Sequence, residues 1–180
     1  FAKMNQNIYY LTPDSLTVNL FVPSEYTDKA TGLGVKMQTN LPDEDTVCEM
    51  YLKTVKSLKS LGFNQYEISN FAKPSFESRH NTKYWILDDY LGLGKSAHSF
   101  WGGKRFYYDT DWSLKSEGKV DLEEERIMLG LRLNRGIDKS LVKKDFSCFV
   151  KMGLMKESEN KIALTSEGML VSNLIISELL

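Results

Sequence analysis

The feature that most constrains the fold is a helical repeat that lies between two strand-like segments. Residues 43–61 carry apolar side chains at spacings of three and four, the pattern of a helix with one buried face. A Pro-Asp pair begins this repeat, and Gly62 is a natural stop. Residues 16–22 before it and residues 65–71 after it have the composition of strands. Strand, helix and strand in this order predict a βαβ unit with a parallel sheet.

A polar and aromatic segment follows the second predicted strand. Residues 72–90 are predicted to form a long loop, and a glycine-rich stretch over 92–99 comes directly after them. Two short strands over 99–101 and 104–108 then flank Gly102-Gly103, which predicts a hairpin with a two-residue turn. Because functional side chains in parallel barrels collect where strands end, we expect the site at this loop.

The composition changes near residues 116–118, which predicts two domains, 1–116 and 117–180. In the second domain we expect helices over 121–133 and 139–146, a short helix ending near Met152, a two-stranded hairpin around 159–160, and a last helix from Thr165 to Leu179. Asp121 is expected to cap the first of these helices and Thr165 the last. Helix, helix, hairpin and helix is a winged-helix-like pattern.

Composition excludes several classes of protein. With 23 Lys and Arg against 24 Asp and Glu, the net charge is −1, which lacks the field of a dedicated nucleic-acid binder. No apolar run approaches the roughly 18 residues of a membrane span, although peripheral membrane contact stays open. The two cysteines form no CxxC pair, which argues against an iron–sulfur cluster within this chain and fits a reducing, cytoplasmic compartment.

Three motifs look chemical rather than merely structural. Residues 66–74 read YEISNFAKP, residues 80–85 read HNTKYW, and residues 90–99 read YLGLGKSAHS. Together they resemble the C-terminal half of HemW-type proteins, which are radical S-adenosylmethionine (SAM) proteins related to oxygen-independent coproporphyrinogen III oxidase. The resemblance implies an α/β fold: the last strands and helices of an incomplete radical-SAM (β/α)6 barrel, followed by a small α+β winged-helix-like domain.

The resemblance also implies cofactors that this chain cannot hold alone. The family binds a [4Fe–4S] cluster through a CxxxCxxC motif and uses SAM, but that motif is absent here. We therefore expect a fragment of a longer parent, with no radical chemistry in this chain by itself.

The HNxxYW motif of the family falls on His80, Asn81, Tyr84 and Trp85. HemW-type proteins are thought to be heme chaperones, so the resemblance implies that these residues contact heme and that His80 is a candidate iron ligand. A neutral imidazole is a good axial ligand, and aromatic rings offer flat apolar faces for a porphyrin. Arg105 is a candidate partner for a propionate. The alternative is a histidine that caps a helix, core aromatics, and a solvated arginine.

A second set of residues is expected on the SAM side of the parent. These are Ser69, Asn70, Gly92, Gly94, Ala97 and His98. The first two end the predicted strand, and the glycines let backbone approach a ligand closely. The alternatives are a tight turn for the glycines and a hydrogen-bonded structural role for His98. Glu67 is expected to be a buried structural carboxylate.

These observations favour a part in heme binding and delivery, with heme or porphyrin and heme-receiving proteins as partners. One alternative is that the parent is a coproporphyrinogen III oxidase, which decarboxylates its substrate to protoporphyrinogen IX by a radical route. Another is a winged-helix interaction or regulatory module. An incomplete barrel also leaves a sheet edge open, which predicts self-association.

Overall fold

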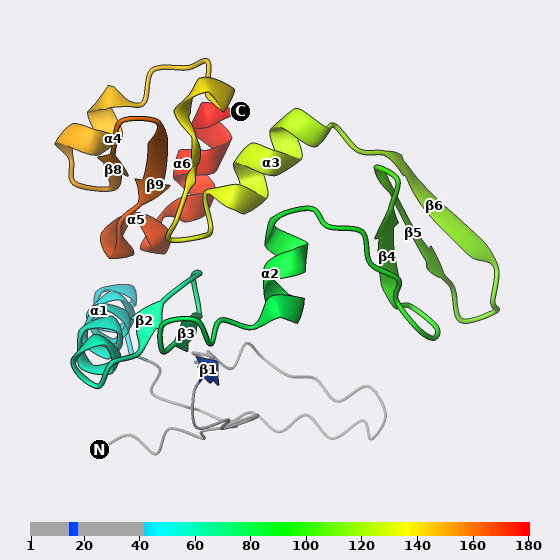
Figure 1. The fold of residues 1–180 in the computed structure, drawn as a ribbon, viewed down its shortest axis with the longest axis horizontal. Coiled ribbons are helices and arrows are strands. Elements are labelled where there is room, and N and C mark those ends of the chain that lie inside the picture. The colour runs from blue at the N-terminus through cyan, green and yellow to red at the C-terminus, as the bar shows by residue number, and fades with distance from the viewer. Residues whose placement is uncertain (1–14, 18–41) are drawn as a thin grey trace.

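The computed structural model describes residues 15–17 and 42–180 of the 180-residue chain. In these residues the fold is mixed α/β, with three separate sheets of three strands each and no closed barrel. Figure 1 shows the sheet β4–β6 at one end and the C-terminal unit at the other, with helices α2 and α3 between them. None of the described helices has the length and apolar character needed to cross a membrane.

The first part contains β1 (Ser15–Thr17), α1 (Glu44–Ser60), β2 (Asn64–Gln65) and β3 (Asn70–Ala72). Helix α1 confirms the helix predicted over 43–61. Asp43 caps its first turn, where its carboxylate accepts the Thr46 N–H at 2.7 Å. Gly62 adopts φ +85° just beyond the helix, the left-handed conformation that a glycine tolerates. The apolar side chains of α1 are only half-buried, and Leu61 is exposed.

The predicted parallel sheet is wrong. Strand β3 lies between β1 and β2 and pairs antiparallel with both. The reason is that residues 65–71 do not form one strand: the chain reverses between β2 and β3, where the Tyr66 N–H donates to the Asn70 carbonyl at 3.0 Å. Residues 18–22 of the first predicted strand lie outside the described residues.

The segment predicted as a loop contains the short helix α2 (Arg79–Trp85), capped by the Ser78 hydroxyl, which accepts the Asn81 N–H at 3.2 Å. It leads into β4 (His98–Trp101), β5 (Lys104–Tyr108) and β6 (Leu114–Lys119). The hairpin is confirmed: Gly102 and Gly103 have φ +56° and +73°, both positive as a tight turn of this kind requires. Residue 116 falls inside β6, and the division of the chain there stays a prediction.

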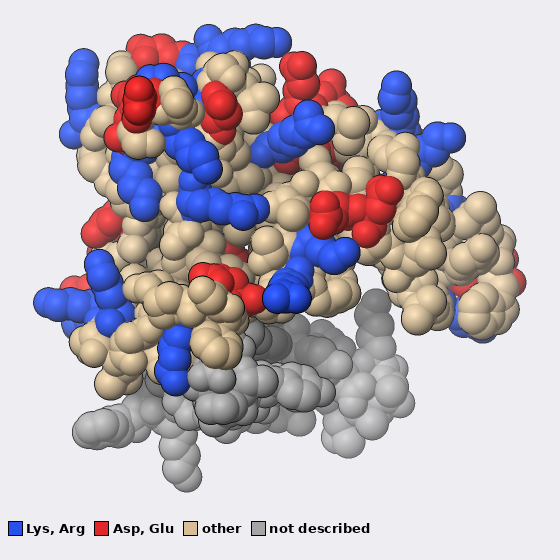
Figure 2. All heavy atoms as spheres, in the orientation of Figure 1, with Lys and Arg blue, Asp and Glu red and all other residues tan. Residues whose placement is uncertain are grey.

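The C-terminal unit comprises, in chain order, α3 (Leu122–Gly130), β7 (Ile137–Asp138), the 3₁₀ turn η1 (Lys139–Leu141), α4 (Ser147–Lys151), β8 (Met155–Glu157), β9 (Lys161–Leu164), α5 (Ser166–Leu170) and α6 (Ser172–Leu179). Its sheet has the order β7-β9-β8 and is antiparallel. The predicted caps Asp121 and Thr165 are both in place, and the predicted hairpin is β8–β9. Figure 2 shows charges of both signs interspersed over this unit, as expected for a chain without a strong net field.

Three predicted helices of this unit are shorter than expected or divided. The helix predicted over 121–133 ends at Gly130. The prediction of a helix over 139–146 is wrong beyond the turn η1, because Val142 is buried in an extended conformation. The Asp145 carboxylate then accepts the Ser147 N–H at 2.9 Å and starts α4 instead. The last helix is divided at Val171, whose φ of −113° and ψ of +24° are not helical, and both α5 and α6 contribute side chains to the same buried cluster.

A cluster of buried apolar side chains lies in the C-terminal unit. Its members include Ile127, Leu131, Ile137, Met155, Ile162, Leu164, Met169, Ile175, Ile176 and Leu179. Tyr51 of α1 packs against this cluster and donates its hydroxyl to the Ile68 carbonyl at 2.9 Å. The core therefore holds the first part of the described chain against the last.

Replacing Ile175 by alanine should lower the free energy of unfolding by about 2–5 kcal/mol, because it leaves a cavity in this buried cluster. Its neighbour on α6, Leu174, is 59% exposed where Ile175 is 0% exposed, which makes Leu174→Ala the matched control. The control should stay within about 0.5 kcal/mol of the parent chain. Urea unfolding followed by circular dichroism measures both, and equal losses would contradict the described packing of α6.

Candidate functional site

His80 and Tyr84 form an exposed pair on helix α2. They are four residues apart, so both side chains lie on one face of the helix. The Tyr84 hydroxyl oxygen is 2.7 Å from Nε2 of His80, a short hydrogen bond whose direction depends on the imidazole tautomer. The rings meet edge to face, with centroids 5.1 Å apart and an interplanar angle of 82°. We call these two residues the His80–Tyr84 pair.

Tyr90 supports this pair from the other side. Its ring lies 4.6 Å from that of Tyr84, again edge to face, and 6.4 Å from the ring of Phe100 on β4. Backbone hydrogen bonds of 2.8 and 3.0 Å join Tyr90 to Phe100 in both directions. Burial raises the pKa of Tyr90, and nearby Arg105 opposes that shift. The result is a strip of aromatic rings that runs from α2 to the β4–β6 sheet.

The other two motif residues fix the helix rather than face solvent. The Asn81 amide donates to the Tyr66 hydroxyl at 3.3 Å, and the Arg132 guanidinium lies over the Trp85 ring at 5.9 Å. Trp85 is half-buried, and its indole N–H has no hydrogen-bond partner among the described residues. The HNxxYW motif is thus divided between two faces: His80 and Tyr84 are outward, while Asn81 and Trp85 hold α2 against its neighbours.

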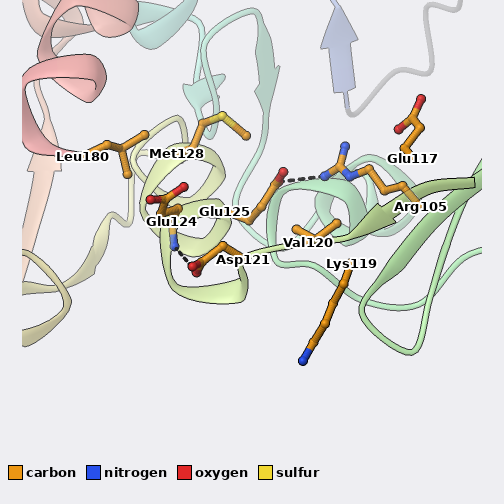
Figure 3. Close-up of a pocket in the computed structure, with 9 residues that line it drawn as sticks. All are labelled: Arg105, Glu117, Lys119, Val120, Asp121, Glu124, Glu125, Met128 and Leu180. Carbon is orange, nitrogen blue, oxygen red and sulfur yellow. Dashed lines mark hydrogen bonds and ion pairs between the residues drawn. The ribbon is translucent and has the colours of Figure 1, made fainter.

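Arg105, the candidate propionate partner, is already paired. One of its Nη atoms lies 2.7 Å from a carboxylate oxygen of Glu125, and the guanidinium is 5.8 Å from the centre of the Phe100 ring. Figure 3 shows this pair in the wall of a cavity of about 370 Å³, which Glu117, Glu124 and other residues also line. A propionate would have to displace Glu125, so the predicted role of Arg105 stays a prediction.

Gly92 is needed by the packing of the chain itself. A Cβ atom there would lie 2.5 Å from the His98 carbonyl oxygen and 2.6 Å from that of Ala97. The Gly92 N–H also donates to the Ser99 hydroxyl at 3.0 Å. Gly94 has φ +102° and belongs to a turn that the Ala97 N–H closes on its carbonyl at 3.4 Å. The tight-turn interpretation therefore accounts for both glycines without a ligand.

The remaining residues of the predicted SAM side are also engaged. His98 places Nδ1 3.2 Å from a Glu117 carboxylate oxygen and packs its ring 4.7 Å from that of Tyr107. The Ser69 hydroxyl donates to Glu67 at 3.3 Å, and Glu67 is 1% exposed, as expected for a buried structural carboxylate.

The predicted SAM-side residues do not form a single group. Ser69 adjoins the sheet that contains Asn70, whereas residues 92–98 adjoin the β4–β6 sheet, and α2 lies between the two sheets in Figure 1. A contribution of these residues to SAM binding stays a prediction.

The cysteines of the chain do not fit a [4Fe–4S] cluster. There are two of them, Cys48 on α1 and Cys148 on α4, whereas such a cluster needs several thiolates in one place. Within residues 42–180, no three His, Cys, Asp or Glu side chains come together in a way that suits a metal ion. No chemistry of a [4Fe–4S] cluster is therefore assigned to these residues.

Sequence reasoning missed two supports of the site. Tyr66 belongs to the YEISNFAKP motif, which gives no sign that its hydroxyl accepts the bond from Asn81. Tyr90 is the first residue of the glycine-rich motif, which gives no sign that its ring packs on Tyr84. The aromatic residues themselves were the available signal, but their pairing depends on the path of the chain after α2.

The comparisons with known proteins agree with these motifs. No family model matches the chain. The heme chaperone HemW of Bacillus subtilis is 30% identical over 168 residues, which cover 77% of this chain and 44% of the relative. The mouse protein named radical S-adenosyl methionine domain-containing protein 1, mitochondrial, is 40% identical over 137 residues, or 61% of this chain and 31% of the relative. The chain belongs to the HemW-like radical SAM family.

A solved structure supports the fold of this HemW-like chain. The radical SAM enzyme coproporphyrinogen III oxidase of Escherichia coli matches with a TM-score of 0.55 and 20% identity. The match covers 76% of this chain and 41% of that one, and at this identity it supports the fold alone. The chain spans less than half the length of each relative named here.

Replacing Tyr66 by phenylalanine should change how stability depends on pH. Burial raises the pKa of Tyr66 above the ordinary 10.0, nearby Glu67 adds to the shift, and the bond from Asn81 opposes it. As the pH rises, the unfolded state therefore loses the Tyr66 proton before the folded state does. The resulting contribution of Tyr66 to the free energy of unfolding is complete below about pH 10 and declines as the pH rises above it.

In Tyr66→Phe the alkaline decline should be shallower. Unfolding free energies in urea between about pH 8 and pH 11, around the ordinary tyrosine pKa, measure it. Tyr108→Phe, at an exposed position, is the control and should keep the parent slope. A uniform loss at every pH, with the slope unchanged, would show that Tyr66 contributes only its hydrogen bond.

Proposed function

We propose that this chain provides the heme-binding surface of a HemW-like heme chaperone, and that heme is its cargo. The observation that carries the proposal is the exposed His80–Tyr84 pair on α2, in the HNxxYW motif and beside the ring of Tyr90. The relatives named as heme chaperones support the same function.

The chemistry of this surface suits heme. Imidazole and phenol side chains are both ligands of heme iron in proteins. The rings of Tyr84 and Tyr90 offer apolar faces for a porphyrin. Arg79 and Lys83 on the same helix are exposed and supply positive charge for the propionates; Lys83 is only loosely paired with Asp88, at 4.0 Å.

Exposure of the ligands suits a cargo that must leave. A heme held on one face of α2 stays accessible to a heme-receiving protein, whereas a heme enclosed in a core does not. We infer that a protein of the relatives' full length holds SAM and the [4Fe–4S] cluster in the region that this chain does not span. A cytoplasmic compartment stays our expectation from the cysteine content.

The enzymatic alternative applies to the longer protein. Coproporphyrinogen III oxidase activity would release CO2 from coproporphyrinogen III, and assaying the cluster-loaded, full-length protein for that CO2 tests it. The structural likeness to the oxidase concerns the fold, so it does not favour this activity over heme delivery.

Titration of the chain with hemin, followed in the Soret region, tests the heme surface. We expect saturable binding that His80→Ala weakens about tenfold or more, a loss of about 1.4 kcal/mol. The only other histidine, His98, is the matched control, since it is bonded to Glu117 and lies on β4 rather than on α2. His98→Ala should bind hemin as the parent chain does. Equal affinities in all three chains, or a loss confined to His98→Ala, would contradict the proposed surface.

A further inference from the structure

One face of the β4–β6 sheet carries large apolar side chains that stay exposed in the described structure. Tyr108 and Leu114 are partners across β5 and β6, so their side chains lie on the same face. Trp101 belongs to this face too, because its partner on β5, Lys104, is four residues from Tyr108 and side chains alternate along a strand. We call this side of the sheet its apolar face.

The turn between β5 and β6 adds Trp112 beside this face. Its ring lies 6.4 Å from that of Tyr108, and the ammonium of Lys95 lies 5.2 Å from the centre of the Trp112 ring. The backbone of Trp112 has a φ of +64°, which costs a bulky residue energy, and its side chain is exposed rather than buried. Strain that burial does not offset is typical of residues held for a contact with a partner.

Two lysines lie next to each other on the same face. Lys104 is the partner of Trp101 on one side and of Lys119 on the other. Like charges directly opposite each other destabilise a sheet. Neither lysine forms an ion pair with a described residue, and Figure 3 shows the Lys119 side chain extending away from the carboxylates of Glu117 and Glu125. An anionic surface laid over this face would relieve the repulsion.

The charge of the whole sheet region also favours an anionic partner. Residues 95–119 hold five Lys and Arg against three Asp and Glu, a net charge of +2, whereas the complete chain carries −1. Figure 2 shows the end of the molecule formed by this sheet as mostly uncharged, with positive side chains above it. Tryptophan and tyrosine rings are enriched at the headgroup level of membranes, and lysines are attracted to anionic headgroups.

We propose that the apolar face of the β4–β6 sheet docks on the surface of an anionic lipid bilayer. The rings of Trp101 and Trp112 enter the headgroup region, and the two neighbouring lysines contact lipid phosphates. The ends of the face are four residues apart on β5, about 13 Å, so one flat surface meets both. A nucleic acid would engage the lysines and stack on the rings, but it offers nothing to Leu114. This inference does not depend on the proposed function.

Co-sedimentation of the chain with sucrose-loaded vesicles tests the proposal. Vesicles of phosphatidylglycerol and phosphatidylcholine in equal parts supply the anionic surface, and vesicles of phosphatidylcholine alone are the neutral reference. We expect saturable binding to the anionic vesicles, about tenfold or more tighter than binding to the neutral ones. Raising the salt concentration should weaken the binding, because it screens the lysines.

Two pairs of variants separate the apolar contribution from the electrostatic one. Trp112→Ala should weaken binding about fivefold or more, because an apolar ring no longer leaves water. Phe76→Ala removes an equally exposed aromatic ring outside the sheet and should bind as the parent chain does. The double variant Lys104→Gln/Lys119→Gln should weaken binding to anionic vesicles about tenfold and leave little preference over neutral ones.

The control for the lysines is Lys56→Gln/Lys59→Gln, which removes two exposed lysines of α1 and should keep the parent affinity. All these positions are exposed or half-buried, and circular dichroism checks that each variant is folded. Absence of binding to anionic vesicles, or equal losses in the sheet variants and their controls, would overturn the proposal. So would retention on a single-stranded oligonucleotide that the sheet variants lose, if the parent chain does not bind vesicles.

Discussion

The arrangement of the candidate site depends on Tyr66, at the point where the chain reverses between β2 and β3. Its N–H closes the turn on Asn70, its carbonyl accepts the Asn134 N–H at 3.0 Å, and its hydroxyl accepts the Asn81 amide at 3.3 Å. One buried residue thus joins the first sheet, the C-terminal unit and α2. Since α2 has only seven residues, far below the length at which a helix is stable in isolation, these outside contacts determine where His80 and Tyr84 lie.

The division of the HNxxYW motif follows from helical geometry. Residues four apart share a face, so His80 lies with Tyr84, and Asn81 lies with Trp85. The inner two contact Tyr66 and Arg132, which leaves the outer two available to a ligand. A motif of six residues can therefore encode both a ligand surface and its attachment, provided that the segment is helical.

This requirement explains what the sequence could and could not predict. The 43–61 helix, the Gly102-Gly103 hairpin and the caps Asp121 and Thr165 depend on local patterns, and they were predicted correctly. The parallel sheet and the helix over 139–146 were wrong, because a reversal at Tyr66 and the burial of Val142 are tertiary effects that override local periodicity. The helix α2 was missed because its pattern spans barely two turns. The motif named candidate residues, but it could not show which of them are outward.

The same geometry changes the chemical interpretation of the motif. Taken as residue types, His80 is the expected iron ligand and Tyr84 a flat surface for the porphyrin. Once the two side chains share a 2.7 Å hydrogen bond, neither acts alone, because the proton between them determines which atom carries an available electron pair. Under the proposed function, the affinity of this surface for heme would therefore depend on both side chains of the pair.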